Sequence, residues 1–143
     1  MIRLRNLYWP VLFLSLCLLT GCSSDMEVEV EEETDDTEYY VQYDVSCVYN
    51  RGYGLKDQPG NVDIRCNGGG INVSKVTDYI WGIVVGPFKK GEIVTLSVNT
   101  SAPLGYSYTI TGKISVSKEF GPYVTCVSLT DKHSVSMSYT IDD

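Results

Sequence analysis

The segment VQYDVSC at residues 41–47 decides the fold class of this 143-residue chain. Positions 41, 43, 45 and 47 are apolar or aromatic, while positions 42, 44 and 46 are polar. Successive side chains of a β-strand point to opposite faces of the sheet, so this alternation is typical of a strand with one buried face. We therefore predict a half-buried strand over residues 40–49.

The pattern continues on the C-terminal side of that segment, where Val, Ile, Thr, Tyr and Ser dominate and helical periodicity is missing. Turn residues recur at short intervals, which indicates short strands. The strands that we expect next cover 61–67, 71–73, 79–85, 94–98, 106–116, 122–129 and 135–141. Residues 79–85 are continuously apolar and predict a central strand ended by Gly86-Pro87, and 106–116 is either one bulged strand or a hairpin. The chain is therefore predicted to be all-β, an antiparallel β-sandwich of seven or eight strands.

The N-terminus has the features of a secretory signal. Arg3 and Arg5 precede an apolar run from Leu7 to Leu19, which is too short for a membrane-spanning helix of roughly 20 residues. The sequence Leu-Thr-Gly-Cys at 19–22 resembles the lipobox of bacterial lipoproteins. This resemblance implies a signal peptide at 1–21, cleavage between Gly21 and Cys22, and a diacylglycerol anchor on Cys22. The alternative is an ordinary signal peptide with an incidental cysteine.

Charge divides the remaining chain into two parts. Residues 23–38 contain nine acidic residues and no Lys or Arg, whereas residues 39–143 contain nine acidic and nine basic residues. The first part has too little apolar content to form a core, so 22–38 is predicted to be a lipidated, acidic, flexible stalk. Residues 39–143 form the predicted sandwich domain. Because the domain has no basic surplus, we expect no nucleic-acid partner.

The domain lacks the residue combinations that catalysis requires. His133 is the one histidine, so neither a histidine–cysteine metal site nor a Ser-His-Asp triad with a Gly-x-Ser-x-Gly turn is indicated. The nine acidic residues are spread over expected loops and outer faces, which does not suggest a carboxylate pair. We therefore expect no enzyme activity, no metal and no cofactor.

Residues 81–129 carry a resemblance to known proteins. They contain a Trp-bearing strand, Lys-Lys-Gly-Glu-x-Val-x-Leu-Ser at 89–97, Ile-Thr-Gly-Lys at 110–113, and a Ser/Thr-rich strand. This order resembles small β-sandwich lipoproteins of gut Bacteroidetes and, more distantly, MmpS-type transport accessory proteins. Ser23 and Ser24 followed by acidic residues are similar to surface-export signals of Bacteroidetes lipoproteins. The resemblance implies an immunoglobulin-like sandwich of unassigned role at the bacterial outer membrane, with exposure at the cell surface as one option.

Three cysteines, Cys47, Cys66 and Cys126, belong to the domain, so at most one disulfide forms within it. The order Cys66, Trp81, Cys126 resembles an immunoglobulin domain, in which the tryptophan packs on a disulfide between the sheets. That resemblance implies a Cys66–Cys126 bond, although position 124 is Val where those domains have a tyrosine. A Cys47–Cys66 bond and three free thiols are the alternatives.

Tyrosine is unusually frequent, with 11 in the chain. Tyr49, Tyr53 and Tyr106 lie near expected loops, where exposed rings bind sugars or anchor a protein partner, although strand tyrosines are more often part of a core. The function expected first is a membrane-anchored, non-catalytic interaction module that reaches the membrane through Cys22. The alternatives are a glycan-binding surface lipoprotein of a nutrient-uptake system and a hydrolase inhibitor that inserts the loop at 50–60 into an active site.

Overall fold

The computed structural model describes residues 36–54, 56 and 58–142. The expected signal peptide at 1–21, the cleavage and lipidation site at Gly21 and Cys22, and the stalk up to residue 35 lie outside the described residues. Over the described part of the chain, no helix has the length and apolar character needed to cross a membrane.

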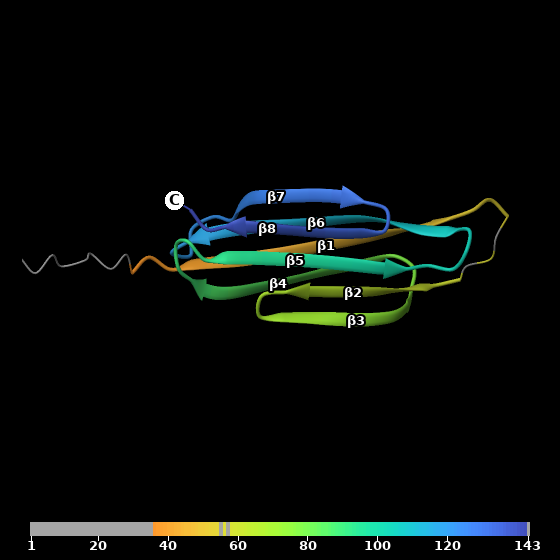
Figure 1. Ribbon diagram of the computed structural model, residues 1–143, viewed down its shortest axis with the longest axis horizontal. Coiled ribbons are helices and arrows are strands. Elements are labelled where there is room, and N and C mark those ends of the chain that lie inside the picture. Colours follow the sequence, from red (N-terminus) through yellow and green to blue (C-terminus); the bar gives the residue numbers. More distant parts are fainter. Residues whose placement is uncertain (1–35, 55, 57, 143) are drawn as a thin grey trace, which may run out of the picture. The chain divides into compact units, whose positions relative to one another are not determined.

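Eight strands make up the domain (Figure 1). They are β1 Tyr39–Arg51, β2 Gly60–Cys66, β3 Gly69–Val76, β4 Tyr79–Phe88, β5 Ile93–Ser101, β6 Tyr106–Lys118, β7 Val124–Asp131 and β8 Ser134–Thr140. They form two four-stranded sheets with the orders β4-β1-β6-β7 and β3-β2-β5-β8, and every pair is antiparallel. The predicted all-β antiparallel sandwich is confirmed, with eight strands.

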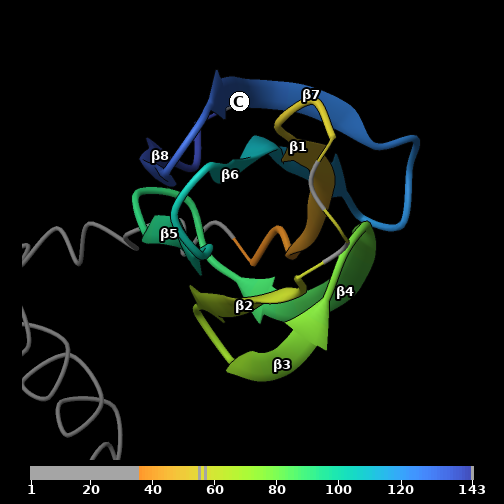
Figure 2. The same cartoon turned by 90° about the vertical axis from the view of Figure 1, so that its right-hand side faces the viewer.

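The core lies between the two sheets and follows the alternation seen in the sequence. On β1, the side chains at positions 39, 41, 43, 45 and 47 are buried, and the residues between them are more exposed. The facing sheet contributes Val62, Ile64, Leu96 and Val98, which are all fully buried. Each such side chain stabilises the fold by about 1.5–3 kcal/mol relative to an exposed position. Figure 2 shows the strands of both sheets nearly end-on around this shared core.

The order of the strands departs from the immunoglobulin arrangement, in which the first and second strands are neighbours in one sheet. Here β1 pairs with β4 and β6, while β2 belongs to the opposite sheet. The pairing of β1 with β6 is continuous over 13 residue pairs, from Tyr39 with Lys118 to Arg51 with Tyr106. The long alternating segment that defines the fold class is therefore the centre of one sheet.

The prediction that residues 79–85 form a central strand is wrong, because β4 is an edge strand whose described hydrogen-bonded neighbour is β1 alone. Its apolar residues are shared between two faces. Trp81, Ile83 and Val85 pack against the core, whereas Ile80 and Val84 lie on the outer face with 83% and 50% of their surface exposed. A continuous apolar run thus reflects here an exposed edge and not a strand buried on both sides.

Two expected boundaries also differ. Gly86-Pro87 does not end β4, which continues to Phe88 through a cis peptide bond and a shift in register against β1. Residues 106–116 belong to one strand, β6, and its irregularity against β7 lies between Ile114 and Ser115. The bulged-strand alternative is thereby favoured over the hairpin.

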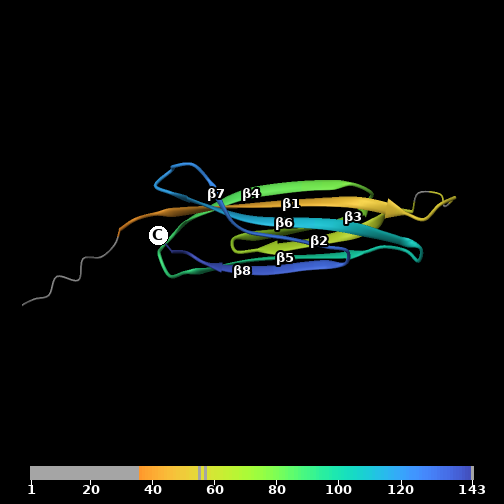
Figure 3. The ribbon, with the colours of Figure 1, turned by 90° about the horizontal axis from the view of Figure 1, so that it is seen from above.

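The two ends of the sandwich are well separated. At about 3.3 Å per residue, the 13 residues of β1 span about 40 Å. The chain enters at Tyr39, and the β1–β2 and β5–β6 loops lie together at the opposite end (Figures 1 and 3). We call this end, formed by residues 52–54, 56, 58–59 and 102–105, the distal tip.

Candidate functional site

The two loops of the distal tip are joined through their main chains. The Gly52 amide donates a hydrogen bond to the Gly105 carbonyl at 3.2 Å, and the Tyr106 amide donates to the Pro103 carbonyl at 3.1 Å. The second bond closes the turn that leads from β5 into β6. The tip is therefore one connected surface formed by two loops that are about 50 residues apart in sequence.

Tyr49 and Tyr106 brace the longer of these loops. Their rings are stacked, with centroids 5.6 Å apart and an interplanar angle of 16°. The Tyr49 hydroxyl donates to the Gln58 carbonyl at 2.8 Å and accepts from the Gln58 amide at 3.2 Å. The Tyr106 hydroxyl donates to the Lys56 carbonyl. Two of the three tyrosines that sequence reasoning selected are thus brought together, but their hydroxyl groups hold the loop backbone.

Beneath this pair, Tyr108 connects the two sheets. Its ring centroid is 5.5 Å from that of Tyr49, and its side chain is fully buried. Its hydroxyl accepts a hydrogen bond from the Gly60 amide at 3.0 Å and donates to the Val76 carbonyl. Burial raises the pKa of Tyr108, and the Gly60 hydrogen bond opposes that effect. Because β6 belongs to one sheet and these partners to the other, Tyr108 fixes the base of the tip.

Gly60 is required at the first position of β2. A Cβ atom there would lie 2.2 Å from the Ser101 carbonyl oxygen and 2.9 Å from the Tyr108 hydroxyl. Contacts this close do not occur in folded proteins, so a larger residue would displace the end of β5 or break the Tyr108 hydrogen bond. Sequence reasoning assigned Gly60 to a loop and did not identify Tyr108 as a bridging residue.

Two large side chains at the tip are fully exposed to solvent, Tyr53 and Leu104. Tyr53 follows Gly52 and Leu104 precedes Gly105. Because the main chains of these two glycines are hydrogen-bonded to each other, the two side chains lie on neighbouring parts of the same surface. Leu104 was missed in the sequence analysis. The available signal is its place between Pro103 and Gly105, since a leucine inside a tight turn has no core to enter. The braced backbone therefore presents two unburied apolar groups.

The predicted sugar platform is not formed by the three tyrosines acting together. Tyr49 and Tyr106 are partly buried and stack on each other, while Tyr53 stands apart with its ring in solvent. A stacking site for sugars needs ring faces that are open to the ligand. The arrangement can instead offer an aromatic and an aliphatic anchor on a stiff support.

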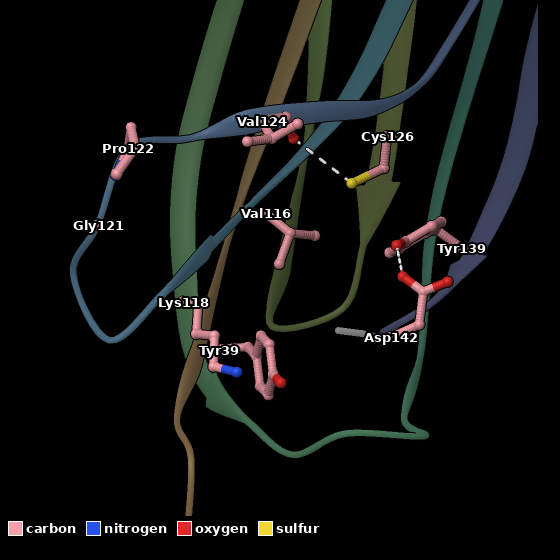
Figure 4. Close-up of a pocket in the computed structure, with 9 residues that line it drawn as sticks. All are labelled: Tyr39, Val116, Lys118, Gly121, Pro122, Val124, Cys126, Tyr139 and Asp142. Atoms are coloured by element: carbon pink, nitrogen blue, oxygen red, sulfur yellow. Dashed lines mark hydrogen bonds between the residues drawn. The ribbon is translucent and has the colours of Figure 1, made fainter.

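A second feature lies at the opposite end, where β7 and β8 meet along an open seam of the sandwich (Figure 4). The cavity there measures about 350 Å³. Its lining is mostly apolar and consists of Tyr39, Val116, Lys118, Gly121, Pro122, Val124, Cys126, Tyr139 and Asp142. We call this cavity the seam pocket.

Polar groups of the seam pocket are engaged with one another. The Tyr139 hydroxyl donates to a carboxylate oxygen of Asp142, and this hydrogen bond is the main cause that raises the pKa of Tyr139. The Cys126 thiol donates to the Val124 carbonyl at 3.4 Å, and the Lys118 ammonium lies 5.9 Å from the centre of the Tyr39 ring. The pocket can thus accept an apolar group but does not assemble a catalytic pair.

The expected Cys66–Cys126 disulfide is not formed, because the three thiols of Cys47, Cys66 and Cys126 are free. Cys66 is on β2, which is separated from β8 by β5: Cys66 is paired with Leu96 of β5, and Leu96 is paired with Met137 of β8. Cys126 is on β7 in the opposite sheet and interacts with Tyr139 of β8, so the two cysteines are at least two strand spacings apart. Two strand spacings amount to about 10 Å, beyond the roughly 7 Å between Cα atoms that a disulfide allows.

The alternative Cys47–Cys66 bond is not formed either. Cys47 is buried on β1 and Cys66 ends β2 in the other sheet, and both thiols are free. Burial raises the pKa of Cys47 to about 11. Trp81 lies on the edge strand β4 and packs against the apolar core, not on a disulfide.

His133 is exposed in the turn between β7 and β8, where its main chain is hydrogen-bonded to Asp131 and Thr100. Within the described residues, no group of three or more His, Cys, Asp or Glu side chains is placed to hold a metal ion. No family model, no curated protein and no solved structure matches this chain.

Proposed function

We propose that this protein is a membrane-anchored lipoprotein whose sandwich is a non-catalytic interaction module, and that it binds a protein partner through the distal tip. The observation that carries the proposal is the full exposure of Tyr53 and Leu104 on loops that Tyr49 and Tyr106 brace. Tyrosine is one of the residue types that most often dominate binding energy in protein interfaces, and Leu104 adds exposed apolar surface on the neighbouring loop.

Preorganisation supports this reading. Ordering a loop on binding costs about 0.5–1.5 kcal/mol for each side chain that is immobilised. The stacked tyrosines, their hydrogen bonds to the backbone at 56 and 58, and the Gly52–Gly105 bond hold the tip before a partner arrives. A partner would therefore immobilise the two exposed side chains but would not also have to order the loop main chain that carries them.

The position of the tip also fits a displayed module. The chain enters the domain about 40 Å from the tip, measured along the 13 residues of β1. In the proposal, the lipid on Cys22 and the self-repelling acidic stalk at 22–38 attach this entry end to the bacterial outer membrane, with exposure at the cell surface as one option. The tip is then the end of the domain that is remote from its attachment point.

Glycan binding is the second candidate. It is favoured by the ring of Tyr53, which is open to solvent on the same loop as the exposed polar side chains of Lys56 and Gln58. One open ring beside hydrogen-bonding groups suits a single sugar residue better than an extended chain.

Site-specific photo-crosslinking in the producing cell tests the proposal with the full chain. A photo-reactive amino acid at position 53 or 104 should give a discrete adduct with one protein, and the same group at Ile93 should not. Ile93 is a suitable control because it is 60% exposed and begins β5 at the end remote from the tip. The adduct at position 53 should decrease when Leu104 is changed to Asp.

A parallel polysaccharide pull-down with the Tyr53→Ala variant separates the two candidates. Saturable glycan binding that this variant loses, without any protein adduct, would replace the protein-binding proposal by the glycan one. Neither a tip-specific adduct nor glycan binding would overturn both.

A further inference from the structure

β4 is one of the four edge strands of the two sheets. Within the described residues, β4 pairs with β1 on one side and with no strand on the other. Residues 79–85 read Tyr-Ile-Trp-Gly-Ile-Val-Val and contain neither a charged residue nor proline. Pro87 and the register shift against β1 lie beyond this stretch, at the C-terminal end of β4. Exposed edges are normally protected by charges, prolines or bulges that prevent pairing with another chain. Edge strand β3, by contrast, carries Lys75 with a φ of 60°.

The outer face of this edge is also apolar. Ile80 and Val84 are 83% and 50% exposed, with Gly82 between them on the same face. Their neighbours across β1 are Ser46 and Gln42, which are polar. The apolar strip is therefore restricted to the strand at the edge, where another strand could cover it.

We infer that β4 pairs with β4 of a second copy of this chain, antiparallel and about a two-fold axis through Gly82. In an antiparallel pair, the side chains of two directly opposed residues point to the same face of the sheet. An outer-face residue of one β4 must therefore be opposite an outer-face residue of the other. An axis through Gly82 places Ile80 opposite Val84 of the other copy, twice, and Trp81 opposite Ile83. Each exposed apolar side chain then gains an apolar neighbour.

This occupant fits the hydrogen bonding and the charge of the edge. In an antiparallel ladder, alternate residues direct both their N–H and C=O groups to the same side, so about half of the β4 residues have these groups at the free edge. A second β4 satisfies them. Asp44 on β1 lies level with Gly82 at the centre of the proposed pair. Its counterpart in the second copy is three strand spacings away, about 14 Å, which is beyond the screening length of about 8 Å at physiological salt.

The mass of the full chain, extracted in mild detergent and measured by light scattering that corrects for detergent, tests the inference. The wild type should be dimeric, and Ile80→Lys should shift dissociation to at least tenfold higher concentration, because it introduces two lysines at an apolar interface. Ile80 is mostly exposed, so the monomer should keep its fold, as circular dichroism would verify. The matched control Ile93→Lys places the same charge on an exposed isoleucine of the inner strand β5 and should leave the dimer intact.

The register gives a second, independent test. Chains with Ile80→Cys and chains with Val84→Cys should form an interchain disulfide when they are produced together and oxidised. Either variant alone should not do so beyond the wild-type level, since two copies of position 80 are four residues, about 13 Å, apart in this register. A monomeric wild type, a dimer that survives Ile80→Lys, a dimer that Ile93→Lys also breaks, or crosslinks of a different register would overturn the inference.

Discussion

Replacing Tyr108 or Tyr43 by Phe removes the same oxygen atom from the core and should change stability in different ways. Both side chains are fully buried. The Tyr108 hydroxyl bonds to the Gly60 amide and the Val76 carbonyl. Among the described residues, the Tyr43 hydroxyl has no hydrogen-bond partner, and Asn67 lies near it without reaching hydrogen-bonding geometry.

The magnitude follows from what each substitution leaves behind. Tyr108→Phe strands a buried N–H and a partly buried C=O, and each such group costs about 1–3 kcal/mol. If the partly buried carbonyl costs about 1 kcal/mol, the low end of this range, the free energy of unfolding should fall by about 2–4 kcal/mol in total. Tyr43→Phe removes a buried hydroxyl that has already lost its water, so stability should stay the same or rise by up to about 1–2 kcal/mol.

Urea unfolding of the full chain, followed by circular dichroism, measures both differences. The midpoint of Tyr108→Phe should fall, that of Tyr43→Phe should not, and the dependence on urea should be the same in all three proteins. Equal losses in the two variants would refute the assigned hydrogen bonds. So would a loss in Tyr43→Phe that exceeds the loss in Tyr108→Phe.

Three other outcomes are expected. Cys126, at the seam pocket, should react with a small alkylating agent in the native protein, whereas buried Cys47 should react only after unfolding, as mass spectrometry of peptides would show. Burial raises the pKa of Cys47 from 9.0 to about 11 and of Tyr43 from 10.0 to about 12. Folding thus favours the protonated thiol and the protonated hydroxyl. The stability that this adds to the fold is fully present below about pH 9 and should be lost as the pH rises through 11 and 12, by up to about 2–3 kcal/mol per group in urea titrations. Unchanged stability over this range would contradict the assignment. Tyr49→Ala removes the stack and the hydrogen bond to the loop, so trypsin should cleave after Lys56 several-fold faster at unchanged circular dichroism.

Local patterns in the sequence were sufficient to predict the fold class and the faces of the strands. The alternation at 41–47 places each side chain on one face or the other, because the period of a strand is two residues whatever its neighbours are. It therefore identified Val41, Tyr43, Val45 and Cys47 as core residues, and all four are buried. The count of strands followed from turn residues in the same local way, as did the location of Tyr49, Tyr53 and Tyr106 in or next to loops.

The tertiary structure decided which strands are neighbours, and with them the sites. Pairing joins residues such as Tyr49 and Tyr106 that are far apart in the chain, and no local pattern encodes that choice. The pairing of the strands also places β4 at an edge, although its apolar run is equally compatible with a central strand. It likewise keeps Cys66 away from Cys126. Face is a property of a residue and its immediate neighbours, whereas adjacency depends on the packing free energy of the whole chain.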